Sequence, residues 1–223
     1  MALKDKLKIL PSLLLVMMIC SSCANIGLYE ELGGYIKNIF TEPEDLDPSL
    51  VEKVKFASMQ MRLGKNPNTL IVLEEDNQGI LKWTSSNDIK IYTHKGIITR
   101  FMGLENELSI LEIDKNHPIL IENINKEKEV NLTSFYTFKN PDLFRLPVKT
   151  KFYYAQSVDM IIFGESIKAD IYKEEALDNL IDWKFTNFFW IHQGTKKVIK
   201  STQSITPKNP KVFYTITRDY IKQ

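Results

Sequence analysis

Short runs of β-branched and aromatic residues, separated by tight turn signals, constrain this chain more than any other feature of its sequence. From about residue 70 onward, apolar and polar residues alternate with period two, which is typical of half-buried strands. Gly, Asn and Asp punctuate the runs, as at Asn87-Asp88, Lys95-Gly96 and Gly194. The ten runs that we interpret as strands are residues 70–74, 80–85, 89–94, 97–102, 130–138, 148–163, 167–172, 183–192, 197–206 and 212–221. This pattern favours antiparallel strands joined by hairpins.

We therefore expect a mainly β fold: an antiparallel sandwich or a curved half-barrel of about ten strands with a short N-terminal helical region. Within that region, apolar residues at three- and four-residue spacing over residues 28–40 predict an amphipathic helix. Asp47-Pro48 predicts the start of a second helix that runs to about Lys55. Residues 104–129 are less informative, and we expect a loop there with one short helix or edge strand.

The first 23 residues have the pattern of an exported lipoprotein. A basic start is followed by a 12-residue apolar run, residues 9–20. That run is too short for the roughly 20 residues of a membrane-spanning helix, but it fits the apolar region of a signal peptide. Ser21 and Ser22 then place two small residues before Cys23, as in a lipobox. Cys20 occupies a position where leucine is usual, so an ordinary signal peptide with a coincidental cysteine remains the alternative.

We expect a lipoprotein signal peptide at residues 1–22, a lipid-anchored tether at 23–28 and a single mostly-β domain at 29–223. Beyond Cys23 the chain has no cysteine, which excludes disulfides and thiolate chemistry from that domain. Acyl chains such as palmitate on Cys23 would anchor the protein to a membrane. Ala24 stands where many lipoproteins of the inner membrane carry an aspartate, so we expect the periplasmic face of the outer membrane.

Charge argues against a nucleic-acid partner. The whole chain carries +1, and residues 1–22 carry +2, which leaves −1 for the rest. Positive and negative residues are interspersed, whereas an electrostatic nucleic-acid binder needs a basic face. The partners that we expect are the membrane, through the lipid anchor, and a polysaccharide or the proteins that secrete it.

Motifs for catalysis and metal binding are missing from the sequence. There is no GxSxG motif and no Gly-rich phosphate loop. The histidines, His94, His117 and His192, lack the spacing of a metal site. His94 precedes one hairpin turn and His192 opens another, so we expect solvated turn residues. We expect no catalytic residue, no metal and no cofactor.

One enzymatic alternative stays open. A glycosidase requires two carboxylates about 5–10 Å apart. A glycan hydrolase or lyase would draw its carboxylates from Glu74, Glu75 or Asp182. Glu174 and Glu175 are expected in a loop or short helix. A structural envelope lipoprotein without a glycan role is a further alternative.

Five aromatic residues lie close together near the C-terminus. They are Trp183, Phe185, Phe188, Phe189 and Trp190. Alternation places the first two and Phe189 on one face of a strand, and Phe188 and Trp190 on the other. Buried core is the commoner fate of such residues. An exposed aromatic face would instead offer a glycan or partner surface, because aromatic rings stack on sugars.

Three segments in order along the chain carry a resemblance to a known family. The first is Phe56-Ala57-Ser58 with Arg62-Leu63. The second is Leu81-Lys82-Trp83 with Ser85, Thr93, Gly96 and Gly103-Leu104. The third is Trp183 with Asn187, Phe189-Trp190, Gly194, Val198, Ser201, Gln203 and Pro207. In these segments the chain resembles the group 4 capsule polysaccharide lipoproteins, the GfcB/YjbF family, and only residues 112–146 depart from the family pattern.

The resemblance implies an outer-membrane lipoprotein that acts as a non-enzymatic accessory in capsule or exopolysaccharide production and secretion. It implies a mostly-β fold and no catalytic residue. We interpret Trp83 as a buried indole, and Gly96 and Gly103 as turn positions that need positive φ. These three residues are expected to define the fold.

Overall fold

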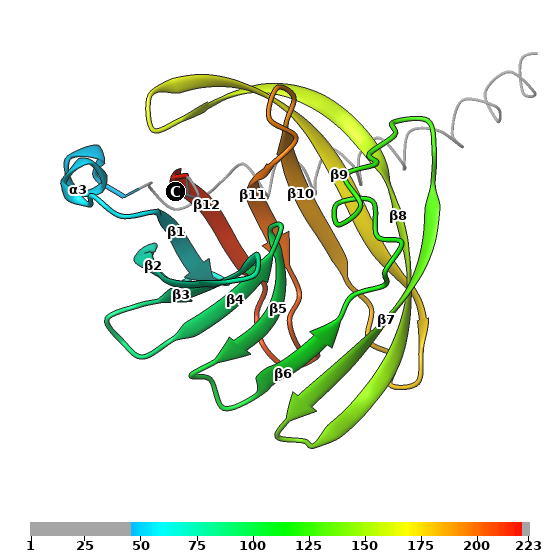
Figure 1. Cartoon of the computed structure of the whole chain (residues 1–223). Coiled ribbons are helices and arrows are strands. Elements are labelled where there is room, and N and C mark those ends of the chain that lie inside the picture. Colours follow the sequence, from blue (N-terminus) through cyan, green and yellow to red (C-terminus); the bar gives the residue numbers. More distant parts are fainter. Residues whose placement is uncertain (1–45, 220–223) are drawn as a thin grey trace, which may run out of the picture. The chain divides into compact units, whose positions relative to one another are not determined.

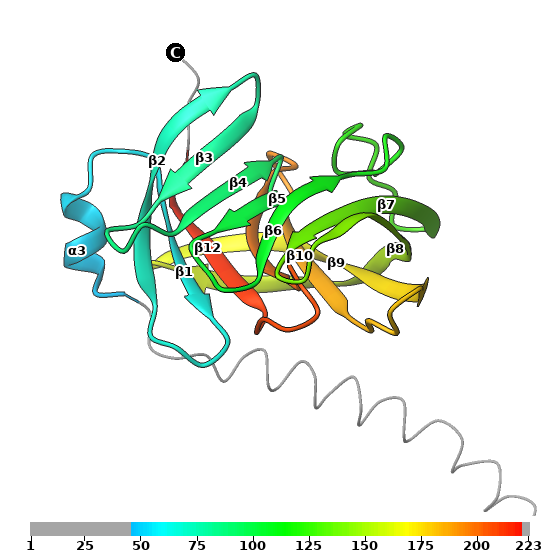
Figure 2. The ribbon, with the colours of Figure 1, turned by 90° about the horizontal axis from the view of Figure 1, so that it is seen from below.

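Strands dominate residues 46–219, the part of the chain that the computed structural model describes. Twelve strands in this range form one closed antiparallel barrel, shown in Figure 1 and, turned by 90°, in Figure 2. The strands are β1 (Ser58–Leu63), β2 (Thr69–Asn77), β3 (Ile80–Thr84), β4 (Lys90–His94), β5 (Ile97–Met102), β6 (Glu107–Glu112), β7 (Val130–Lys139), β8 (Leu143–Ile162), β9 (Glu165–Asn179), β10 (Thr186–His192), β11 (Val198–Gln203) and β12 (Val212–Arg218). Each strand pairs with its neighbours in sequence, and β1 pairs with β12 to close the ring.

The mainly β, antiparallel prediction is confirmed, but the open architecture and the number of strands were wrong. Each of the ten expected runs overlaps a strand, and the barrel adds β1 and β6. Closure depends on β1, where Met61 pairs with Tyr214 of β12 and with Thr69 of β2. A half-barrel leaves two free edges whose backbone groups lack partners, and pairing β1 with β12 satisfies them.

A short helix precedes the barrel, as expected from Asp47-Pro48. Helix α3 spans Pro48–Lys53, and the Asp47 side chain accepts a hydrogen bond from Ser49 N at 2.9 Å. Val51 is buried, while the rest of the helix is exposed. The expected signal peptide, the tether with Cys23 and the helix over residues 28–40 lie outside the described residues.

The three residues expected to define the fold have the conformations that the sequence predicts. The Trp83 indole is buried, and its Nε1 donates to Thr93 Oγ1 at 2.9 Å. Gly96 has φ +91° and Gly103 has φ +96°. At Gly96 an added Cβ would lie 2.5 Å from Val198 Cβ, so both the backbone conformation and the contact with β11 require glycine.

The connection between β6 and β7, residues 113–129, folds into one end of the barrel, and we call it the plug segment. His117, Pro118 and Ile119 are buried, and the His117 ring packs edge-on against Phe152 with centroids 4.9 Å apart. The sequence did not predict this role. Strand β6 occupies part of the 104–129 stretch, but it is an inner member of the closed sheet, not an edge.

Candidate functional site

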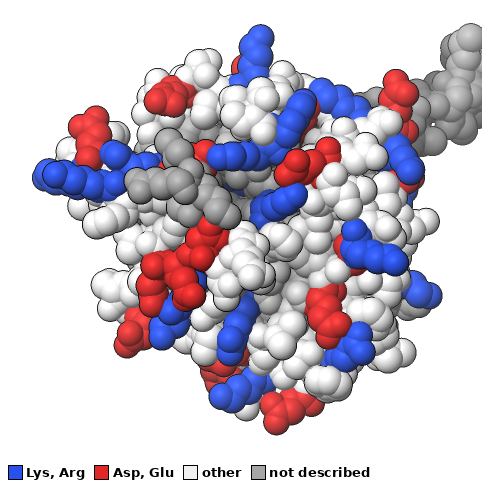
Figure 3. All heavy atoms as spheres, viewed as in Figure 1, with Lys and Arg blue, Asp and Glu red and all other residues white. Residues whose placement is uncertain are grey.

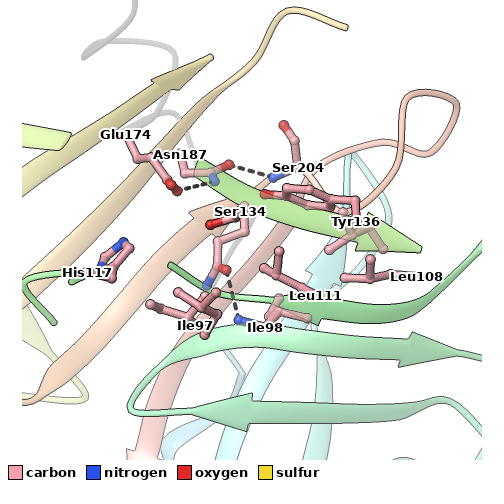
Figure 4. Close-up of a pocket in the computed structure, with 13 residues that line it drawn as sticks. Ile97, Ile98, Leu108, Leu111, His117, Ser134, Tyr136, Glu174, Asn187 and Ser204 are labelled. Atoms are coloured by element: carbon pink, nitrogen blue, oxygen red, sulfur yellow. Dashed lines mark hydrogen bonds between the residues drawn. The ribbon is translucent and has the colours of Figure 1, made fainter. Parts of the chain in front are cut away.

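A buried polar network joins three strands inside the barrel, and Figure 4 shows its Glu174, Asn187 and Ser204 part. The Glu174 carboxylate on β9 accepts one hydrogen bond from Thr150 Oγ1 of β8 and one from Asn187 Nδ2 of β10, both at 2.9 Å. Asn187 Oδ1 accepts from Ser204 N, also at 2.9 Å. Glu174 was expected in a loop or short helix, and that expectation was wrong. Its partners explain the strand position, because a carboxylate is tolerated in a core when both oxygens are hydrogen-bonded.

Burial sets the ionisation of two neighbours of this network. It lowers the pKa of His117 and outweighs the opposing pull of the Glu174 and Asp114 charges. Burial also raises the pKa of Tyr136 well above its ordinary value, and the Glu174 charge adds to that effect. Both side chains are therefore neutral near pH 7. His117 Nδ1 accepts from Ile119 N at 3.2 Å, whereas Nε2 has no hydrogen-bond partner within residues 46–219.

The space beside this network is too small for a ligand. The cavity lined by His117, Glu174 and Asn187 has a volume of about 10 Å³. That is room for about one water molecule, whereas ligand pockets measure about 300–1,000 Å³. The barrel interior is a packed core, and the polar network serves to hold strands together.

A second polar cluster holds the plug segment in place. Asp170 on β9 accepts hydrogen bonds from Lys126 Nζ at 2.7 Å, Ser157 Oγ at 2.7 Å and Gln193 Nε2 at 2.8 Å. Burial alone would raise the pKa of Asp170, but the hydrogen bonds from these three side chains outweigh it and lower the pKa. The carboxylate therefore stays charged and ties the plug segment to β8, β9 and the turn after β10.

An open groove lies on the outer surface over β3 to β6, and its volume is about 330 Å³. We call it the outer groove. Its lining residues are Ile80, Tyr92, His94, Thr99, Arg100, Ser109, Ile110, Leu111, Ile113 and Leu120. Most of this lining is apolar, and Ile80 and Ile110 are 41% and 52% exposed. Its size falls within the range of ligand sites, so it is the candidate functional site.

Weak pairing between two strands explains why the groove opens here. Strands β5 and β6 share one ladder pair, Phe101 with Leu108. A β5 backbone group also has a side-chain partner outside this ladder, because Ile98 N donates to Gln203 Oε1 at 2.9 Å. Leu111 and Ile113 line both the outer groove and the interior cavity, so they form the floor between the two spaces.

The charges around the outer groove leave one arginine without a carboxylate. Lys82 pairs with Glu74 at 2.6 Å, and Lys95 pairs with Glu122 at 2.8 Å. The Arg100 Cζ lies 5.4 Å from the centroid of the Tyr92 ring, and none of the carboxylates that the structure describes lies within 4.0 Å of its guanidinium.

His94, at the same groove, has a lowered pKa because of burial and the charge of Lys95, which makes it neutral near pH 7. Its position beside a hairpin turn agrees with the sequence, but it and His192 are half-buried and His117 is buried, so the expectation of solvated histidines was wrong. Figure 3 shows the wider surface, on which acidic and basic side chains are interspersed over the face in view.

The five aromatic residues singled out in the sequence are all buried. Trp183, Phe185 and Phe189 belong to the barrel core, and their exposed fractions are 7%, 7% and 0%. Phe188 and Trp190 have the opposite orientation on β10 and are also buried, with ring centroids 6.1 Å apart. Burial is the commoner of the two fates considered for this cluster. Sugars stack on exposed rings, so we do not place glycan binding on these side chains.

The carboxylates considered for an enzyme do not meet. Glu74 and Glu75 lie on β2, whose neighbours in the sheet are β1 and β3. Asp182 lies in the connection from β9 to β10 and pairs with Lys184 at 3.2 Å, where both side chains are 84% exposed. Among residues 46–219 no group of three or more His, Cys, Asp or Glu side chains is arranged to hold a metal ion. In the same range, no helix is long and apolar enough to cross a membrane.

The sequence pointed to few of the residues that line the outer groove. His94 lines the groove and was singled out in the sequence, whereas Arg100, Tyr92 and Ile110 were not. The signal that could have placed Tyr92 on an outer face is its alternation with Ile91 and Thr93, which are buried. Nothing in the local sequence distinguishes Arg100 from an ordinary solvated arginine, because its lack of a carboxylate partner is a property of the folded surface.

Comparisons with known proteins agree with the fold and with the resemblance in the sequence. The family model for YjbF, group 4 capsule polysaccharide lipoprotein GfcB, matches residues 29–217. The chain is 22% identical over 157 residues to the uncharacterized lipoprotein GfcB of Escherichia coli strain K12, covering 70% of this chain and 72% of that protein. The crystal structure of the hypothetical lipoprotein YmcC of E. coli K12 matches with a TM-score of 0.65 at 18% identity, covering 80% of this chain and 92% of that chain.

Proposed function

We propose, on the premise that this chain belongs to the YjbF (GfcB) family of group 4 capsule polysaccharide lipoproteins, that it is a lipid-anchored accessory of capsule or exopolysaccharide secretion. In this proposal Cys23 carries the anchor, Ala24 directs the protein to the outer membrane, and the barrel faces the periplasm. The barrel binds glycan or a partner of the secretion machinery, and it catalyses no reaction.

The observation that carries the proposal is the family match over residues 29–217, which spans nearly all of the chain after Cys23. Two structural features support a binding role. The interior cavity beside the Glu174 network has room for about one water molecule, so this cavity is too small for a substrate. The outer groove, by contrast, is large enough for a sugar unit or a short peptide segment.

The test is secreted polysaccharide in a deletion strain, complemented with the wild-type gene or with Cys23→Ser. We expect deletion to reduce secretion, the wild type to restore it and Cys23→Ser to fail, because the unanchored protein is not held at the membrane. Comparable protein levels of the two forms are the necessary control. Normal secretion in the deletion strain, under conditions in which the wild type secretes, would contradict the proposal.

A second experiment tests the non-enzymatic part of the proposal. The purified protein is incubated with the host's own polysaccharide, and the reducing ends and chain length are followed over time. We expect no turnover. Turnover that disappears after one substitution, such as Glu74→Gln, would replace the accessory role by the hydrolase or lyase alternative.

A further inference from the structure

We propose that the outer groove binds a saccharide unit that carries a carboxylate, with Arg100 as the residue that recognises the charge. This inference rests on the proposed function, because a polysaccharide must first be what the protein handles. It goes further by naming the chemical class of the ligand and the surface that takes it.

The charge balance of the groove points to an anion. The two lysines beside it are neutralised by Glu74 and Glu122, and His94 is neutral near pH 7. Arg100 is exposed and has no partner among the carboxylates that the structure describes. A guanidinium binds a carboxylate through two parallel N–H···O bonds, which gives direction as well as strength.

Arg145 shows what is unusual about Arg100. Arg145 also lies over an aromatic ring, 4.8 Å from the centroid of Phe135, and it is similarly exposed. Its guanidinium, however, pairs with Glu112 at 2.9 Å. Two arginines therefore have the same exposed, ring-stacked setting, and only the one in the groove is free to take an external carboxylate.

The rest of the lining suits the body of a sugar. Pyranose rings present C–H faces and a rim of hydroxyls. Ile80, Ile110 and Leu120 offer aliphatic contacts for the C–H faces. The Ser109 hydroxyl and Tyr92 phenol, also in the lining, bring polar atoms that can exchange hydrogen bonds with sugar hydroxyls. Because the groove is open to solvent, a polymer can lie along it without presenting a free end.

The Arg100 side chain is held in a favourable position before a ligand binds. Tyr92 pairs across the sheet with Lys82 on one side and Arg100 on the other. Stacking on the Tyr92 ring restricts the guanidinium, which reduces the entropy lost on binding. The ring thus positions Arg100 beside the apolar floor formed by Leu111 and Ile113.

The test titrates the full-length protein in detergent with trigalacturonate, a probe that carries carboxylates, and with maltotriose, a neutral probe of equal length. We expect saturable calorimetric binding of trigalacturonate only, weakened by salt. Arg100→Gln should weaken it about tenfold or more, since a hydrogen-bonded charge is lost. Ile110→Asp, which places a negative charge in the groove at an exposed position, should weaken it as well. Arg145→Gln, the matched control, should bind like the wild type.

Equal binding of both sugars, no saturable binding at millimolar trigalacturonate, or unchanged binding by Arg100→Gln would each overturn the inference. The same variants are then placed in the deletion strain. Normal secretion with Arg100→Gln, in a background where deletion abolishes secretion, would refute the proposed role of the outer groove but leave the proposed function standing. Lost secretion with Arg100→Gln, without trigalacturonate binding in vitro, would assign the groove to a protein partner and also overturn the inference. Normal secretion without the gene would remove the proposed function itself.

Discussion

Charged side chains have opposite surroundings inside the barrel and at its outer groove. Inside, the Glu174 carboxylate is hydrogen-bonded at both oxygens, by Thr150 and Asn187. Outside, Arg100 is exposed and lacks a partner among the described carboxylates. A fully satisfied buried group specifies the fold, because losing any partner is costly. An unpaired charge beside an apolar groove contributes little to folding and remains available for a ligand.

Breaking the inner network should have the largest effect on stability. Asn187→Leu keeps the branching of the side chain at Cγ but leaves the Glu174 carboxylate short of one donor and Ser204 N without its acceptor. We expect the free energy of unfolding, measured in urea, to fall by about 3 kcal/mol or more. Asn123→Leu, at an exposed position of the plug segment, is the control and should change it by about 0.5 kcal/mol or less. A loss as small as that of the control would show that the network does not hold the barrel together.

A second substitution tests the scaffold where β4 turns into β5. Gly96→Ala combines a positive φ of +91° with a Cβ placed 2.5 Å from Val198 Cβ. Gly79→Ala has nearly the same φ, +89°, and nothing within 4 Å of the new Cβ. Backbone strain alone costs about 1–3 kcal/mol, and the clash should add about 1–3 kcal/mol to Gly96→Ala. The difference between the two unfolding free energies isolates the contact with β11, and equal losses would mean that Val198 moves aside freely.

The barrel interior and the outer groove each contain a histidine with a lowered pKa, His117 and His94, and both make the stability depend on pH. The folded-state pKa of His117 is lowered by burial, so between that pKa and about 6.5 the unfolded chain binds more protons than the folded one. Stability is therefore fully present above about pH 6.5 and is lost as the pH falls, by at most about 1.4 kcal/mol per pH unit. His94 at the groove has a shift of the same sign, from burial and then Lys95.

Urea unfolding between pH 7.5 and 5.5 measures both effects. We expect His117→Gln to flatten the pH dependence more than His94→Gln, because His117 is buried and His94 is half-buried. The absolute stability of each variant differs, so the comparison uses the slope against pH. A steeper slope in His117→Gln than in the wild type would contradict the assignment of a neutral, buried imidazole.

Local patterns in the sequence predicted most of the barrel but not its closure. The hairpin turn at Lys95-Gly96 follows from alternation and turn residues, which act over a few positions, whereas the buried indole of Trp83 was expected from the family resemblance. Strand β1 (Ser58–Leu63) alternates polar and apolar residues as a strand does, but the run is only six residues long and was not interpreted as a strand. Its pairing with β12 joins segments about 150 residues apart, which no local pattern records.

The candidate site was less predictable than the fold for a related reason. The aromatic cluster from Trp183 to Trp190 attracted attention by its composition, yet its five rings are buried. The outer groove arises from the single ladder pair between β5 and β6, and from ion pairs that neutralise Lys82 and Lys95 but not Arg100. Both are properties of the assembled surface. Residue type could identify the chemistry of an arginine, but not whether a carboxylate reaches it.

Removing the charge of Arg100 should have the smallest effect on stability but should still weaken trigalacturonate binding. Arg100→Gln loses only the stacking on Tyr92, which is worth about 0.5–1 kcal/mol at an exposed site. The glutamine stem keeps part of the contact with the ring, so the unfolding free energy should drop by about 0.5 kcal/mol or less. Arg145→Gln loses a salt bridge as well and should cost as much or slightly more. Urea unfolding of both variants, set beside their trigalacturonate affinities, gives the decisive contrast. If Arg100→Gln destabilises the barrel as strongly as Asn187→Leu does, Arg100 belongs to the scaffold, and the separation between a satisfied interior and a free outer charge fails.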